Sequence, residues 1–96
     1  MILAIDQGTT GTSVLVFDRS GRLRGRAYEE LPQHFPRPGW VEHDPEQILQ
    51  MTLRVIRRAL NGARMRATQL AAIGITNQRE TTILWDRATG QSVARA

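Results

Sequence analysis

The residues best suited to chemistry occupy one short polar stretch near the N-terminus, residues 6–12, with the sequence DQGTTGT. Apolar runs on either side read as two short strands, so the stretch is predicted to be the turn of a hairpin. Gly8 and Gly11 can take backbone angles that a Cβ would forbid, which lets successive N–H groups converge on an anion. An ionised Asp6 only accepts hydrogen bonds and suits a hydrated divalent cation facing the same anion. The stretch therefore predicts a phosphate-binding loop formed by Gly8, Thr9, Thr10, Gly11 and Thr12.

An ordinary glycine hairpin with an aspartate in its turn would have the same spacing, because short glycine motifs often occur by chance. The stretch is not a Walker A loop, since no Lys follows the glycines and a strand, rather than a helix, comes next. Phosphate binding is therefore a hypothesis that needs support from the rest of the chain.

A second polar stretch, residues 76–81 (TNQRET), follows an apolar run at 70–75 that is predicted to be a strand. Because this strand returns after a helix, it should lie parallel to a strand of the first group, with a right-handed crossover. Its apolar character fits a sheet that is covered on both faces. Ligands collect at the carboxyl ends of strands in α/β sheets, so the polar residues after this strand are the second candidate site.

The elements that must position these two stretches are predicted from the spacing of apolar residues. Residues 22–29 alternate between small or apolar and Arg or Tyr side chains, which indicates a third strand that is wet on one side. Asp44 followed by Pro45 is a strong helix start, and the helix should run to about Asn61, with Gly62 as its stop. Its stripe facing the sheet is expected at Leu49, Leu53, Ile56 and Leu60, broadened by Ile48, Thr52, Val55 and Ala59.

Two irregular parts complete the chain. Three prolines within residues 31–39 predict an ordered but irregular connection, anchored against the core by Trp40 and Val41. Residues 82–85 and 91–94 look like a closing hairpin. Four residues of this connection and of the helix start carry atoms that could bind a metal: His34, Glu42, His43 and Asp44. Lone histidines in a loop are more often structural.

Composition limits the class of protein. With 96 residues and 41% hydrophobic content, the chain should fold as one domain or part of one, with no internal boundary between residues 1 and 96. The absence of Cys excludes disulfides and thiolate metal sites. All 13 basic residues are Arg and they are spread along the chain, so nucleic-acid binding is not expected. The N-terminal apolar run stops at Asp6, which predicts no membrane insertion and a cytoplasmic location.

Three stretches taken together resemble one family: residues 6–10 (DQGTT), 33–45 (QHFPRPGWVEHDP) and 74–81 (GITNQRET). They are similar to the N-terminal part of the glycerol kinases, within the FGGY carbohydrate kinases. The resemblance covers the whole chain, but proteins of that family are several times longer. It implies an α/β fold of the ribonuclease-H-like, actin-like ATPase type, with three strands, a helix and a fourth strand in a mixed sheet, followed by the C-terminal hairpin.

The resemblance also implies residue roles. Thr9 and Thr10 match threonines that contact the phosphates of ATP or ADP, and Asp6 matches a carboxylate near Mg²⁺. Arg79 and Glu80 match the pair that binds glycerol hydroxyls, and a guanidinium donor beside a carboxylate acceptor suits a small polyol. A surface ion pair between the two neighbours is the alternative.

One departure concerns the residues that follow Thr10. The family commonly continues with Ser and, two positions further on, an Arg that contacts the nucleotide, whereas this chain has Gly11, Thr12 and Ser13. That Arg contact is therefore in doubt. The catalytic aspartate base, the substrate-stacking aromatics and the adenine site of the family lie beyond Ala96.

The resemblance predicts that the full-length protein transfers the γ-phosphoryl group of ATP to glycerol, using Mg²⁺. The expected partners are glycerol and ATP or ADP, with the full-length protein forming a homo-oligomer. This chain alone should be inactive, because it lacks the catalytic base. Three alternatives remain: a kinase for another polyol or sugar of the same family, a nuclease of ribonuclease-H type with its aspartate on the first strand, and a non-catalytic interaction module.

Overall fold

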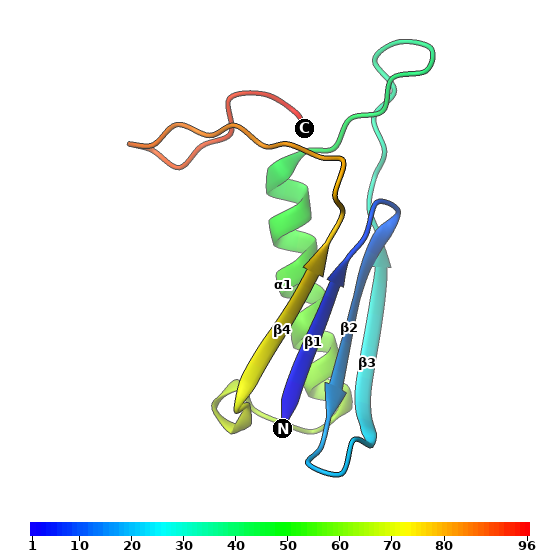
Figure 1. Ribbon diagram of the computed structural model, residues 1–96, viewed down its shortest axis with the longest axis vertical. Helices are drawn as coiled ribbons and strands as arrows, with labels where there is room; N and C mark the ends of the chain where they lie inside the picture. Colours follow the sequence, from blue (N-terminus) through cyan, green and yellow to red (C-terminus); the bar gives the residue numbers. More distant parts are fainter.

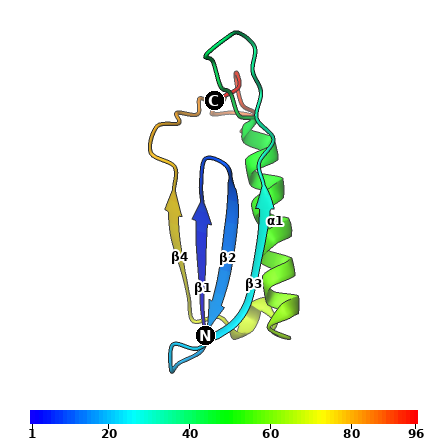
Figure 2. The same ribbon diagram turned by 90° about the vertical axis from the view of Figure 1, so that its right-hand side faces the viewer.

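In the computed structural model, which describes residues 1–96, four strands form one mixed sheet with one long helix against one of its faces (Figures 1 and 2). The order of the strands across the sheet is β3-β2-β1-β4. Their bounds, with those of helix α1 and the short 3₁₀ helix η1, are Ile2–Gln7 (β1), Gly11–Phe17 (β2), Leu23–Glu30 (β3), Pro45–Gly62 (α1), Ala67–Gln69 (η1) and Ala72–Asn77 (β4). No helix is both long and apolar enough to cross a lipid bilayer.

The pairing of the strands follows the predicted order. β1 pairs antiparallel with β2, and β2 pairs antiparallel with β3, so the first 30 residues form a three-stranded meander. After α1 the chain returns to place β4 parallel to β1. Both β1 and β4 therefore end at the same edge of the sheet, and the loops that follow them lie together there (Figure 1). The predicted α/β fold with a mixed sheet is confirmed.

The core lies between α1 and one face of β1, β2 and β3. Alternate residues of the strands point into it, and they meet residues from successive turns of the helix. Its fully or nearly fully buried members are Leu3, Ile5, Val14, Val16, Leu31, Met51, Val55, Ala59 and Leu60. Gly25 lets β3 approach the helix closely, since a Cβ there would lie 2.5 Å from the backbone oxygen of Ala59. Each buried aliphatic side chain contributes about 1.5–3 kcal/mol relative to exposure.

The helix begins as predicted, but the face that it turns to the sheet agrees only in part with the prediction. The Oδ1 atom of Asp44 accepts a hydrogen bond from the backbone N–H of Glu46 at 2.9 Å, which caps the first turn. Leu49 and Leu53, expected in the buried stripe, are 52% and 38% exposed. The helix is apolar over a wide arc, so periodicity alone allows more than one inward face. Val55, Ala59 and Leu60 are buried as predicted. Packing on β3 and β2 buries Met51 in place of Leu49 and Leu53.

The helix also ends differently. Gly62 is its last residue, and the left-handed residue is Arg64, with φ of 55°. The N–H of Met65 donates to the carbonyl of Leu60 at 2.9 Å and that of Arg64 donates to the carbonyl of Asn61 at 3.0 Å, which together form a Schellman ending. The prediction of Gly62 as the stop is wrong by two residues, because these two hydrogen bonds place the left-handed position after Ala63.

Three further expectations are corrected. Trp40 and Val41 do not anchor the connection, since both are exposed and the connection closes on itself through a bridge between His34 and Glu42. The C-terminal segments do approach each other as a hairpin, but through a single bridge between Trp85 and Ser92, without forming strands. The fourth strand is exposed at every residue, because α1 lies over β3 and β2 and no element covers the opposite face.

Candidate functional site

The two candidate stretches meet at the edge of the sheet where β1 and β4 end. The hydroxyl of Thr9, in the turn between β1 and β2, donates a hydrogen bond of 2.7 Å to the carboxylate of Glu80, 71 residues further along the chain. The same carboxylate accepts a second hydrogen bond, of 3.0 Å, from the backbone N–H of Arg79. These bonds hold the pKa of Glu80 below its usual value, with the Thr9 hydroxyl as the largest cause, so the carboxylate is ionised at neutral pH.

In the turn between β1 and β2, two carbonyl groups accept hydrogen bonds from the segment after β3, whereas several donors have no partner. The N–H of Leu31 donates to the carbonyl of Thr10 at 2.8 Å, and the Nε2 atom of Gln33 donates to the carbonyl of Thr9 at 2.9 Å. The backbone N–H groups of Thr9 and Thr10 and the hydroxyl of Thr10 have no hydrogen-bond partner within the chain. Successive free N–H groups beside hydroxyls are the arrangement that binds phosphate oxygens.

The two glycines shape this turn by close approach and not by unusual angles. Neither Gly8 nor Gly11 has a positive φ, which corrects the expectation from sequence. A Cβ on Gly8 would lie 3.1 Å from the carbonyl oxygen of Gly11, which accepts a hydrogen bond of 2.8 Å from the N–H of Gly8. A Cβ on Gly11 would lie 2.5 Å from both the carbonyl oxygen of Glu29 and the hydroxyl oxygen of Tyr28. Only glycine therefore fits at the start of β2.

Thr12 is removed from the candidate phosphate ligands. Because β2 begins at Gly11, alternation places the side chain of Thr12 on the same face as Val14 and Val16, toward the helix. It is fully buried, and its hydroxyl has no partner in the structure. A phosphate at the surface of the turn cannot reach it. The free donors of the turn are therefore those of Thr9 and Thr10.

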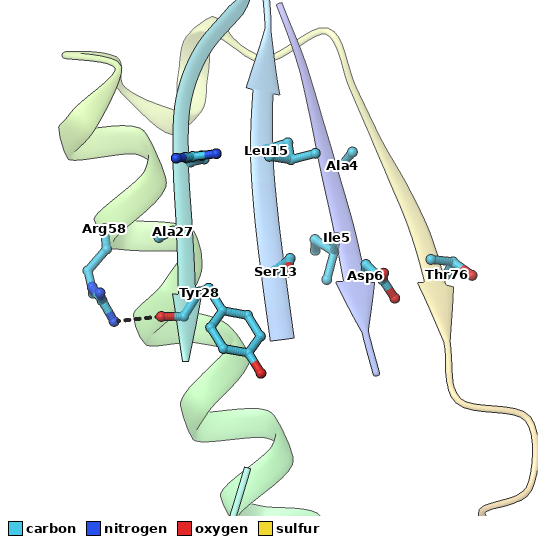
Figure 3. Close-up of a pocket in the computed structure, with 10 residues that line it drawn as sticks. Ala4, Ile5, Asp6, Ser13, Leu15, Ala27, Tyr28, Arg58 and Thr76 are labelled. Carbon is cyan, nitrogen blue, oxygen red and sulfur yellow. Dashed lines mark hydrogen bonds between the residues drawn. The ribbon is translucent and has the colours of Figure 1, made fainter. Parts of the chain in front are cut away.

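Asp6 lies on the opposite face of the sheet, which α1 leaves open. In register with it are Tyr28, Ser13 and Thr76, one from each of the other strands, as Figure 3 shows. This row forms part of the wall of a shallow cavity of about 690 Å³. The Asp6 carboxylate makes no hydrogen bond or ion pair within the chain.

The residues around Asp6 fit a hydrated magnesium ion better than a dehydrated metal. They offer one carboxylate and the hydroxyl oxygens of Ser13 and Thr76, and hard oxygen donors are those that Mg²⁺ accepts. No group of three His, Cys, Asp or Glu side chains is close enough together in the structure to hold a metal directly. A cation beside Asp6 would therefore keep most of its water or take phosphate oxygens as further ligands.

Arg79 and Glu80 do not form the surface ion pair that was the alternative. The three ion pairs of the structure lie elsewhere: one joins β3 to the turn before it, and two join β3 to α1. Glu80 is bound by Thr9 and by a backbone N–H, while the guanidinium of Arg79 has no hydrogen-bond partner in the chain. Both side chains are exposed, so a guanidinium donor and a carboxylate acceptor are available next to the turn.

Sequence reasoning missed a buried polar network beneath this site. His43 is 4% exposed and Gln78 is 8% exposed, although both carry polar groups. The Nε2 atom of His43 lies 2.7 Å from Oε1 of Gln33, and its Nδ1 atom lies 3.3 Å from Nε2 of Gln78. Gln78 also donates through its backbone N–H to the carbonyl of Gln7 at 2.8 Å. All four residues lie within the three stretches that carry the family resemblance, which is the signal that could have found them.

The same contacts account for the residues considered as an alternative metal cluster. Nε2 of His34 lies 3.1 Å from Oε1 of Gln47, and both nitrogens of His43 face glutamine amides. Asp44 caps the helix. The imidazole and carboxylate groups of these three residues are therefore engaged in hydrogen bonds that shape the connection and the start of α1.

Known proteins are similar to this chain in sequence and in fold. A model of the N-terminal domain of the FGGY family of carbohydrate kinases matches residues 1–96. A curated glycerol kinase from Agrobacterium fabrum is 61% identical over 95 residues, or 99% of this chain. A crystal structure of Plasmodium falciparum glycerol kinase with ADP has a TM-score of 0.88 and 34% identity over 98% of this chain. A crystal structure described as a xyloylose kinase from Brucella ovis has a TM-score of 0.87 and 27% identity over 97%.

The chain spans about a fifth of the length of these proteins, 19% in each case. The fold hardly distinguishes the two kinases, since their TM-scores differ by 0.01 (0.88 − 0.87). Sequence identity does separate them, because it is higher for the glycerol kinases.

Proposed function

Since the chain belongs to the FGGY family of carbohydrate kinases, we propose that it forms the N-terminal part of a longer kinase that transfers the γ-phosphoryl group of ATP to glycerol. In this proposal it supplies the phosphate-binding turn and half of the glycerol site. The observation that carries the proposal is the 2.7 Å hydrogen bond from the Thr9 hydroxyl to the Glu80 carboxylate, which joins a phosphate-type turn to a polyol-type acceptor. The 61% identity to a glycerol kinase supports glycerol as the substrate.

The chain's own residues would act by positioning and by charge. The free N–H groups of Thr9 and Thr10 would take up oxygens of the terminal phosphates. The Glu80 carboxylate would accept from a glycerol hydroxyl and the Arg79 guanidinium would donate to another, which orients the triol. Because phosphoryl transfer asks mainly for alignment and for stabilisation of charge, holding both substrates at one edge of the sheet is itself a contribution to catalysis.

Two components of the proposed reaction, the magnesium ion and the catalytic base, are not groups of this chain. Bound Mg²⁺ would neutralise charge on the phosphate oxygens, and Asp6 is the residue of this chain that would hold it through water. The base that takes the proton from the glycerol hydroxyl is expected from residues beyond Ala96. The open face of the sheet around Asp6 leaves room for both the phosphates and further residues of the protein.

A substrate panel tests the proposed function. ADP formation would be measured for a complete kinase that carries this chain as its N-terminal part, with glycerol, xylulose, ribulose and gluconate as acceptors. We expect the largest kcat/KM for glycerol, by at least about 100-fold, because a site built to hydrogen-bond particular hydroxyls rejects analogues that leave its polar groups unpaired. Faster turnover of one of the sugars would assign the protein to another branch of the family.

A further inference from the structure

The buried network beneath the site connects its two halves through one side chain. Gln33 reaches the phosphate-binding turn, since its Nε2 atom donates to the carbonyls of Thr9 at 2.9 Å and Leu31 at 3.0 Å. Gln78 lies two residues before Glu80, and its Oε1 atom accepts a hydrogen bond of 2.8 Å from the hydroxyl of Thr81. The imidazole of His43 lies between these two amides and contacts both.

The directions of these hydrogen bonds admit one form of His43. Because the Nε2 atom of Gln33 donates to two carbonyls, its Oε1 atom faces His43 and must receive a proton from the imidazole Nε2. The Nε2 atom of Gln7 donates to the carbonyl of Gly8, so its Oε1 atom is left to accept from Nε2 of Gln78 at 3.4 Å. The Nε2 atom of Gln78 therefore also faces His43 and must donate to the imidazole Nδ1. The network is therefore complete only with a neutral imidazole that carries its proton on Nε2.

On the basis of the proposed function, we propose that His43 is a positioning residue of the kinase, which fixes the phosphate-binding turn at Thr9 relative to the polyol-binding carboxylate of Glu80. It touches neither substrate. Rotating the amide of Gln33 would break its bonds to Thr9 and Leu31, and rotating that of Gln78 would place its oxygen against the amide oxygen of Gln7. The network therefore holds one arrangement and resists others. A displacement of about 1 Å between reacting groups costs up to ~100-fold in rate, which makes such a fixed distance valuable.

The surroundings of His43 favour the neutral form that the network needs. Burial lowers the pKa of His43, and the nearby imidazole of His34 lowers it further, while the carboxylate of Glu80 acts in the opposite sense. The imidazole is therefore neutral at pH 7. The single tautomer is then set by Gln33 and Gln78, as a second hydrogen bond commonly sets the tautomer of a functional histidine.

Variants of His43 in the complete kinase that carries this chain test the proposal. His43→Phe keeps the ring and removes both hydrogen bonds. His43→Asn can still accept from Gln78 but cannot reach Gln33, whereas His43→Gln can still donate to Gln33 but loses Gln78. His34→Asn is the matched control, because His34 is an imidazole on the same connection that bonds to Gln47 of α1 and not to the network.

We expect kcat for phosphorylation of the preferred polyol to fall about 10- to 100-fold in His43→Phe, with KM for each substrate changed less than about 3-fold. His43→Asn and His43→Gln should each recover part of that loss. ATP hydrolysis in the absence of polyol should change less than about 2-fold, because it does not need the distance between Thr9 and Glu80. The control variant should keep kcat within about 2-fold.

The opposite results would overturn the proposal. If His43→Phe lowers the melting temperature but leaves kcat unchanged, the network has only a structural role. Equal losses of hydrolysis and phosphorylation would also contradict it. If His43→Phe does not fold, kcat and ATP hydrolysis of the Asn and Gln variants test the proposal in its place, since each retains one hydrogen bond of the network. If the unmodified kinase prefers another acceptor, the proposed function fails, and the same variants are compared on that acceptor.

Discussion

The residues that pair with strand β1 on its two sides are similar in type but differ greatly in burial. Ile5 pairs with Val14 of β2 on one side and with Ile75 of β4 on the other, and all three point to the same face of the sheet. Val14 is fully buried, but Ile75 is 69% exposed, because α1 lies over β2 and β3 and does not reach β4. Hydrophobic side chains in register therefore do not share a core unless a second layer covers them.

This difference separates the part of the chain that has its own hydrophobic core from the part whose surface is left uncovered. The β1–β3 meander with α1 forms a closed core of its own. The apolar residues of β4 and the open face around Asp6 have no cover within residues 1–96, although the site depends on the end of β4 for Glu80. Since related kinases are about five times longer, we expect the remaining residues of the protein to cover this side.

The largest difference in stability is expected between variants that place a charge at Val14 and at Ile75, the two positions paired with Ile5. Val14→Asp would bury an unpaired carboxylate at a cost of several kcal/mol, comparable to the whole stability of a small domain, so the chain should lose its cooperative unfolding transition. Ile75→Asp should change the free energy of unfolding by less than about 1 kcal/mol and should reduce self-association of the 96-residue chain. Urea denaturation and sedimentation velocity measure both. Equal destabilisation by the two substitutions would show that β4 is covered after all.

A smaller effect is expected where a glycine is needed for space. Gly11→Ala should destabilise the chain by about 1–3 kcal/mol, because its Cβ would meet the backbone carbonyl of Glu29 at 2.5 Å. Gly62→Ala is the matched control, since nothing lies within 4 Å of its Cβ position and Ala is favoured over Gly in a helix by up to about 1 kcal/mol. Thermal unfolding of the two variants should shift in opposite directions. A neutral Gly11→Ala would contradict the close approach of β2 and β3.

The smallest effect concerns pH. The folded pKa of His43 lies below its value of 6.5 in the unfolded chain, because burial disfavours the imidazolium. Its contribution to stability is therefore complete above pH 6.5 and is lost as the pH falls through the folded pKa. His43→Gln should reduce the dependence of the free energy of unfolding on pH in that range. The acidic groups with lowered pKa, Asp18, Glu29, Glu80 and Asp86, act at lower pH, below about 4.5. A profile of the free energy of unfolding that does not change in the variant between pH 5 and 7 would contradict this assignment.

Features that depend on neighbouring residues could be predicted from the sequence. The hairpin pairing of the first strands, the parallel return of the fourth strand and the Asp44 cap follow from short patterns. The roles suggested for Thr9 and Glu80 come from the family resemblance and stay predictions. The inward face of α1 could be predicted only in part, because Leu49 and Met51 both fit an apolar stripe and packing selects between them. The burial of Thr12 depends on where β2 begins, and one residue of register moves a side chain to the other face. The network around His43 joins segments far apart in the chain, which no local pattern connects.

The central claim is that the phosphate-binding turn and the polyol carboxylate form one site, and a double-mutant cycle tests it most directly. In a complete kinase that carries this chain, Thr9→Val, Glu80→Gln and the pair would be compared by kcat/KM for glycerol. Thr10→Val with Glu80→Gln is the control cycle, because Thr10 makes no bond to Glu80. We predict that the losses at Thr9 and Glu80 deviate from a simple product by about 10-fold, or ~1.4 kcal/mol of coupling, while the control losses multiply. Independent losses at Thr9 and Glu80 would contradict a single site.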